Sequence, residues 1–185
     1  SSRDVFDQED IRALEYFAAQ AAVAIMNAVL NADLEERVER RTAELQAALR
    51  DFLKPGMTVY DVGANIGYVS LMLAHHVTSS GRVFAFEALP DNVQRVQKNI
   101  ALNPSVSNVS VFYAAVTDRT GPLVFHVHAL SVGMGKAAGS AGRLDEQYKA
   151  QIIVPGLSLD DFVYEQGNPP PAAVKMDIEG GEVLA

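Results

Sequence analysis

The sequence contains no cysteine and no long apolar run, and both absences narrow what the protein can do. Without cysteine there is no disulfide, no thiolate zinc site and no cysteine nucleophile, which fits a reducing compartment. The longest apolar stretch, residues 17–30, is interrupted by Gln20 and Asn27 and is too short to cross a bilayer. The polar, acidic N-terminus shows no signal peptide. We therefore expect a cytoplasmic protein without a membrane span.

Basic residues are also scarce. The chain has 15 Lys and Arg against 23 Asp and Glu, a formal net charge of -8. Nucleic-acid backbones are bound by clustered basic side chains, and no such cluster occurs outside the N-terminal segment, so we expect no nucleic-acid partner. Hydrophobic residues make up 49% of the chain, which is enough for a globular core.

Glycine and proline are missing from residues 8–52. Good helix formers dominate there, and apolar residues recur three and four positions apart, first up to Ala28 and then in a shifted phase from Leu34. One helix of this length would measure about 60–70 Å, too long to bury against a small domain. We expect it to pair with a second copy in a coiled-coil homodimer; the alternative is a helix folded back on the body.

Two stretches of this segment resemble parts of signalling proteins. FDQEDIRALEYFAAQAAVAIMNAVL resembles the closing helix of a GAF sensory domain, and LEERVERRTAEL resembles the signalling helix that links such sensors to output domains. The resemblance implies a GAF-like terminal helix over residues 1–30 and a signalling, coiled-coil helix over residues 31–52. The ligand-binding sheet of a GAF domain lies outside these residues, so no sensor ligand is implied.

Beyond Pro55 and Gly56, which break the helix, strand-like and helix-like runs alternate. The pattern predicts strands at 57–62, 82–88, 109–116, 122–128 (antiparallel) and 172–181, helices at 68–77 and 90–102, a mobile loop at 129–147 and a short helix at 159–166 capped by Ser158. Such alternation indicates an α/β domain with a mostly parallel sheet. We expect this domain to cover residues 53–185 and to lack its last strands.

The stretch VYDVGANIGYVSLMLA joins the first strand to the first helix through a glycine turn. In parallel sheets, ligands bind at the carboxyl ends of strands. A dinucleotide fingerprint counted from Gly63 needs glycine where Asn65 and Tyr68 stand, which disfavours a nicotinamide dehydrogenase. Gly63 suits a tight turn and Gly67 suits a close helix approach, and a nucleoside ligand without pyrophosphate needs only these two.

Glu87 ends the second strand, twenty residues after Gly67. A carboxylate in this place can accept hydrogen bonds from the hydroxyls of an adenosine ribose. Together with the glycine turn it favours S-adenosylmethionine as the ligand. The alternative is a purely structural turn beside a solvated glutamate.

Five stretches, in this order and spacing, resemble the FkbM-type S-adenosylmethionine-dependent methyltransferases: VYDVGANIGYVSLMLA, GRVFAFEALPDNVQRVQKNIALN, VSVFYAAVTDRTG, LSLDDFV and VKMDIEGGE. The resemblance runs from about residue 52 to the end, with Gly181 where the family commonly has Ala. It implies the Rossmann-like sheet of class I methyltransferases, incomplete at the C-terminus. It also implies methyl transfer to a hydroxyl of a sugar or another small-molecule acceptor.

The resemblance also implies a set of site residues. The cofactor-binding positions would be Asp61, Gly63, Asn65, Gly67 and Tyr68 on the methionine side, Glu87 at the ribose, and Ala88 and Ala115 at the adenine. Asp177 would act as the base or orient the acceptor, with Glu179 and Lys175 behind it. His126 and His128 share a strand face but have no evident third ligand, so no metal site is expected.

Two functions from different classes follow. The first is a methyltransferase coupled to an N-terminal signalling helix. The alternative is a dimeric signalling module whose α/β domain binds the nucleoside without turning it over.

Overall fold

The computed structural model describes residues 51–128, 135–137, 148–178 and 182, together with positions 16, 20, 25–33, 36, 37, 40, 42–44, 47 and 49. The chain divides into two compact units, Ser1–Ala48 and Leu49–Ala185.

The described positions of the first unit are all helical, as the absence of glycine and proline predicted. Large apolar side chains on this helix are exposed, by 64% at Ile25, 68% at Met26, 65% at Val29 and 53% at Leu30. Arg37 forms an ion pair with Asp33 one turn earlier, which supports the helix slightly. Among the described positions of this unit, these four apolar side chains are therefore largely uncovered.

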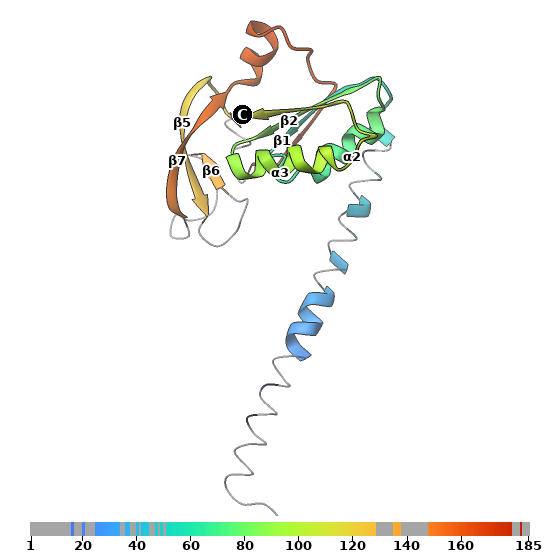
Figure 1. Cartoon of the computed structure of the whole chain (residues 1–185), viewed down its shortest axis with the longest axis vertical. Coiled ribbons are helices and arrows are strands. Elements are labelled where there is room, and N and C mark those ends of the chain that lie inside the picture. Colours follow the sequence, from blue (N-terminus) through green and yellow to red (C-terminus); the bar gives the residue numbers. More distant parts are fainter. Residues whose placement is uncertain are drawn as a thin grey trace, which may run out of the picture. The chain divides into compact units, whose positions relative to one another are not determined.

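The second unit is built on a four-stranded sheet in the order β3-β2-β1-β8, with every neighbouring pair parallel. The strands are β1 (Thr58–Val62), β2 (Arg82–Glu87), β3 (Val109–Tyr113) and β8 (Ala173–Met176), and the crossover helices are α2 (Tyr68–Val77) and α3 (Pro90–Ala101). The first residue of each of these elements agrees with the sequence pattern to within one position, and the α/β fold is confirmed (Figure 1). The strand expected over 172–181 is shorter and ends at Met176.

Alternation along the strands divides the side chains between two faces. On one face Val59 and Val83 pack with Leu73 and Val77 of α2, while Val96 of α3 packs on Ala85. The other face carries an aromatic cluster of Tyr60, Phe84, Phe86 and Phe112 around Phe162. The ring of Phe162 is fully buried, 4.9–5.7 Å from those four rings.

A second sheet stands beside the first, in the order β4-β7-β5-β6 (Figure 1). It comprises β4 (Ala115–Val116), β5 (Gly121–His128), β6 (Gly135–Ala137) and β7 (Tyr148–Leu157). As predicted, β5 is antiparallel to its neighbours. The expected continuous strand 109–116 is wrong, because the chain leaves the first sheet at Ala114 and joins β7 through Ala115 and Val116.

The expected mobile loop needs a second correction. Residues 135–137 form β6 on β5, because that edge of β5 offers backbone groups for pairing. The rest of 129–147 lies outside the described residues.

The expected short helix is present as a wide, π-type helical turn, Asp161–Glu165. The Ser158 hydroxyl accepts a long hydrogen bond from the N–H of Asp161, at 3.4 Å, so its capping is weak. Within the described part of the chain, no helix is both long and apolar enough to span a membrane.

Candidate cofactor site

The turn between β1 and α2 has a backbone that glycine makes possible. Gly63, Asn65 and Gly67 all have positive φ, of 76°, 53° and 85°. A Cβ on Gly63 would lie 2.1 Å from the carbonyl oxygen of Asp177, and one on Gly67 would lie 2.9 Å from Val96 Cγ1. The tight turn at Gly63 and the close helix approach at Gly67 are therefore as the sequence predicted.

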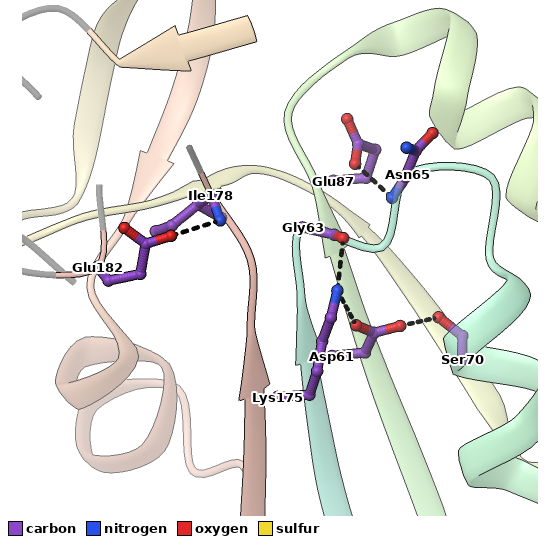
Figure 2. A network of polar contacts seen from close by, with 8 residues as sticks. All are labelled: Asp61, Gly63, Asn65, Ser70, Glu87, Lys175, Ile178 and Glu182. Carbon is purple, nitrogen blue, oxygen red and sulfur yellow. Dashed lines mark hydrogen bonds and ion pairs between the residues drawn. The ribbon is translucent and has the colours of Figure 1, made fainter. Parts of the chain in front are cut away.

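Glu87 meets this turn at the carboxyl end of β2. Its carboxylate is nearly buried, with 6% of the residue exposed. Oε2 accepts a hydrogen bond from the N–H of Asn65 at 2.7 Å (Figure 2), and Oε1 accepts one from the N–H of Leu89 at 2.9 Å. The side-chain amide of Asn92 adds a longer contact to Oε1, at 3.4 Å. One carboxylate thus ties together the turns that follow β1 and β2.

Burial raises the pKa of Glu87 above its ordinary value of 4.5, because desolvation disfavours the charged form. The N–H groups of Leu89 and Asn65, the amide of Asn92 and the N–H of Ala88 lower it in part. A hydroxyl that donates to Glu87 would favour the charged form in the same way.

Whether an adenosine ligand fits depends on how many acceptor sites of the Glu87 carboxylate remain for its hydroxyls. A carboxylate has about four lone-pair sites. One of the two on Oε2 is taken by Asn65, whereas Oε1 already serves Leu89 and, more weakly, Asn92. The N–H of Ala88 also donates to this carboxylate, so four donors share about four acceptor sites, and a ribose hydroxyl would fit where the long contact from Asn92 is displaced.

Asp61 is the other buried carboxylate, with no exposed surface. Its Oδ2 accepts a hydrogen bond of 2.6 Å from the hydroxyl of Ser70 in α2. Its Oδ1 lies 3.1 Å from Nζ of Lys175 on β8, as an ion pair and not as an aligned hydrogen bond. Nζ also donates to the carbonyl of Gly63 at 3.0 Å (Figure 2).

The sequence interpretation did not anticipate two polar contacts at this turn. Ser70 faces Asp61 from the buried side of α2, and Asn99 of α3 donates its amide to the carbonyl of Ile66 at 2.8 Å. Helical spacing places Ser70 among the inward positions of α2, which was the available signal. Nothing local pairs Asn99 with a turn 33 residues earlier.

The predicted adenine-side residues lie together. Ala88, Leu89 and Ala115 are buried in one cluster with Phe125 and Val154 of the second sheet. The N–H of Ala114 donates to the carbonyl of Glu87 at 3.0 Å, which fixes this cluster next to the carboxylate. The side chains of Asn65 and Tyr68 are exposed at the rim of the turn.

Asp177 follows β8 at the same edge of the sheet. Its side chain is exposed, and its N–H donates to the carbonyl of Val62 at 3.1 Å. Glu179 lies outside the described residues. Among those that are described, no cluster of three His, Asp or Glu has the arrangement of a metal site.

Comparison with known proteins gives three findings. Residues 61–185 match the methyltransferase FkbM domain family. The protein-L-isoaspartate O-methyltransferase of Triticum aestivum is 34% identical over 90 residues, 49% of this chain and 35% of that protein. The protein of the same name from Aeropyrum pernix is 45% identical over 47 residues, 25% of this chain and 18% of that one.

Among solved structures, the methyltransferase FkbM from Methylobacillus flagellatus KT is 21% identical, with a TM-score of 0.46, and the match covers 70% of this chain and 28% of that chain. The chain therefore spans about a third or less of the length of each of these relatives.

Proposed function

Because the chain belongs to the FkbM methyltransferase domain family, we propose that its α/β unit transfers a methyl group from S-adenosyl-L-methionine to a small-molecule acceptor. S-adenosyl-L-methionine is also the ligand that the glycine turn and Glu87 favour in the sequence. We propose both the acceptor class and the role of each residue.

The observation that carries the proposal is the meeting of Glu87 with the Gly63–Gly67 turn. A buried carboxylate at the strand end, held by the N–H of Asn65 and only loosely contacted by the Asn92 amide at 3.4 Å, suits a ribose hydroxyl that takes the place of that amide. The turn presents no phosphate-binding glycine pattern, which supports a nucleoside without pyrophosphate. Ala88 and Ala115 belong to a buried apolar cluster beside this carboxylate, and we propose that the adenine ring binds next to that cluster.

The bound cofactor supplies a methyl group already activated by the sulfonium, so the protein's main task is to position the acceptor. Asp177 is exposed at the strand end beside this turn, where it can accept a proton from an acceptor hydroxyl. Its main-chain contact to Val62 holds it next to the carboxyl end of β1. We assign Asp177 as the base or acceptor-orienting group, with Glu179 as a second candidate.

Calorimetric titration with S-adenosylhomocysteine tests the cofactor site. Glu87→Gln keeps the size of the side chain but removes its charge, and we expect at least tenfold weaker binding, about 1.4 kcal/mol. Glu165→Gln is the matched control, because Glu165 is exposed at the end of the helical turn and should bind like the native chain. A native chain that is folded but does not bind S-adenosylhomocysteine would overturn the proposal.

Turnover on hydroxylated acceptors separates the enzyme from the alternative. A chain that binds S-adenosylhomocysteine but transfers no methyl to any hydroxyl in a panel of sugars and small metabolites would favour a non-catalytic signalling module. Loss of turnover in Asp177→Asn, with binding retained, would support its role as the base.

We further propose that the N-terminal helix forms a homodimer and couples the enzyme to a signalling input. The exposed Ile25, Met26, Val29 and Leu30 support this, since a second copy could cover them. Light scattering at micromolar concentration should give the mass of a dimer. A monomeric mass would remove the dimer from the proposal.

A further inference from the structure

Lys175 lies on β8 directly opposite Asp61 on β1. Its ammonium is 3.1 Å from Asp61 Oδ1 and donates to the Gly63 carbonyl at 3.0 Å, so it bridges the strand end and the first residue of the turn (Figure 2). The side chain of Lys175 is 21% exposed, whereas that of Asp61 is fully buried. The ammonium is therefore the outermost member of this pair.

The Gly63 carbonyl needs a partner from outside the strand ladder. Pairing between β1 and β8 ends at Val62 and Met176, so Gly63 lies beyond the paired residues. Backbone carbonyls near the interior are normally satisfied, and here Lys175 supplies the donor.

The same turn is held at two further points. Glu87 accepts from the N–H of Asn65, and Asn99 donates to the carbonyl of Ile66. At its β1 end the turn is held by Lys175 and also by the carbonyl of Phe86, which accepts from the N–H groups of Gly63 and Ala64 at 3.0 Å each, so β2, α3 and β8 together fix this turn.

Asp61 itself cannot reach a ligand from its position. Both carboxylate oxygens are engaged, Oδ2 by Ser70 and Oδ1 by Lys175, and no part of the residue is exposed. A buried charge of this kind requires its partner, so Asp61 fixes where the ammonium stands.

We propose that Lys175 is a positioning residue, which places the Gly63–Gly67 turn for the cofactor through the Gly63 carbonyl, and that Asp61 acts through Lys175 without touching the cofactor. This inference rests on the proposed function of the turn as the S-adenosylmethionine site. In this proposal Asp61 and Lys175 together position the turn and take no part in the chemistry at the methyl group.

The test compares Asp61→Asn with Asp61→Asn/Lys175→Met. Both proteins lack the buried carboxylate charge, so they differ only in the ammonium that holds Gly63. We expect the double variant to bind S-adenosylhomocysteine at least tenfold more weakly than Asp61→Asn. Ser70→Ala is the control for damage near Asp61, because it leaves the contact from Lys175 to Gly63 in place, and its affinity should stay within threefold of native.

A second readout needs no ligand. Amide exchange of residues 63–67, measured by NMR and divided by that of α3 in the same protein, should be at least tenfold faster in the double variant than in Asp61→Asn. Equal affinity and equal exchange in the two proteins would overturn the proposal. A double variant without native circular dichroism would also overturn it, since Lys175 would then be required for folding.

The two readouts keep this inference distinct from the proposed function. If the native chain fails to bind S-adenosylhomocysteine while the exchange of the turn still depends on Lys175, the proposed function is wrong and the positioning of the turn stands. If the native chain binds S-adenosylhomocysteine but the amide exchange of residues 63–67 does not depend on Lys175, only the proposed role of Lys175 is wrong.

Discussion

Gly63→Ala should be among the most damaging small substitutions in the α/β unit. The added Cβ would lie 2.1 Å from the carbonyl oxygen of Asp177 and 3.1 Å from Ile178 Cγ2. The first neighbour is backbone and cannot rotate away, so β8 must move away from β1. Movement there would weaken the hydrogen bond from the N–H of Asp177 to Val62 and the contact from Lys175 to Gly63.

Three contributions add up to the expected loss of stability, and a control variant isolates the first of them. An alanine at positive φ costs about 1–2 kcal/mol. Overpacking adds about 1–3 kcal/mol, and a lost backbone hydrogen bond about 1 kcal/mol. Gly167 has φ of 70° with no atom within 4 Å of the added Cβ, so Gly167→Ala measures the φ cost alone. We expect Gly63→Ala to lose at least about 2 kcal/mol more than Gly167→Ala.

Urea unfolding followed by circular dichroism provides the measurement, with equal slopes required for the comparison. Gly67→Ala should fall between the two, because its Cβ would meet Val96 Cγ1 at 2.9 Å and Val96 Cα at 3.3 Å, both farther than the backbone oxygen 2.1 Å from a Cβ on Gly63. If Gly63→Ala and Gly167→Ala differ by less than about 1 kcal/mol, the close packing of β8 on this turn is not what makes Gly63 necessary.

Three further outcomes can be checked on the same unit. Burial raises the pKa of Glu87, so the folded state binds the Glu87 proton more tightly than the unfolded state does. The protonated side chain therefore contributes stability below about pH 4.5, and this contribution is lost as the pH rises through the folded-state pKa. Across that pH window the unfolding free energy of the native chain should fall more than that of Glu87→Gln. S-adenosylhomocysteine binding should weaken as pH is lowered through the same window, because ribose hydroxyls donate to the carboxylate; a flat affinity profile would argue against Glu87 as the ribose ligand. Phe162→Ala should cost about 3–5 kcal/mol in urea unfolding, since the ring fills the centre of the aromatic cluster, and a loss below about 1.5 kcal/mol would contradict that role. Tyr60→Phe should lose about 1 kcal/mol, because the Tyr60 hydroxyl donates to the carbonyl of Pro169 at 2.7 Å, and an unchanged stability would show that water replaces this donor.

Local features of this chain could be read from the sequence because their causes are local. The helices 68–77 and 90–101 follow from apolar spacing and from Pro90 at a first turn. The turn at Gly63 and Gly67 follows from glycines set between a strand and a helix, and Glu87 was placed beside it because parallel strands end at the same sheet edge. The cofactor roles of these residues remain predictions until binding is measured.

The sequence by itself thus determined, in chain order, the strands and helices of the first sheet, the glycine turn and the position of the acidic strand end. Only the tertiary structure decided that the chain changes sheets at Ala114, because sheet membership depends on which distant strand offers hydrogen bonds to Ala115. It also decided that Asp61 is sealed between Ser70 and Lys175. The bond from Lys175 to Gly63 joins residues 112 positions apart, and no periodicity within a strand or helix encodes a contact at that separation.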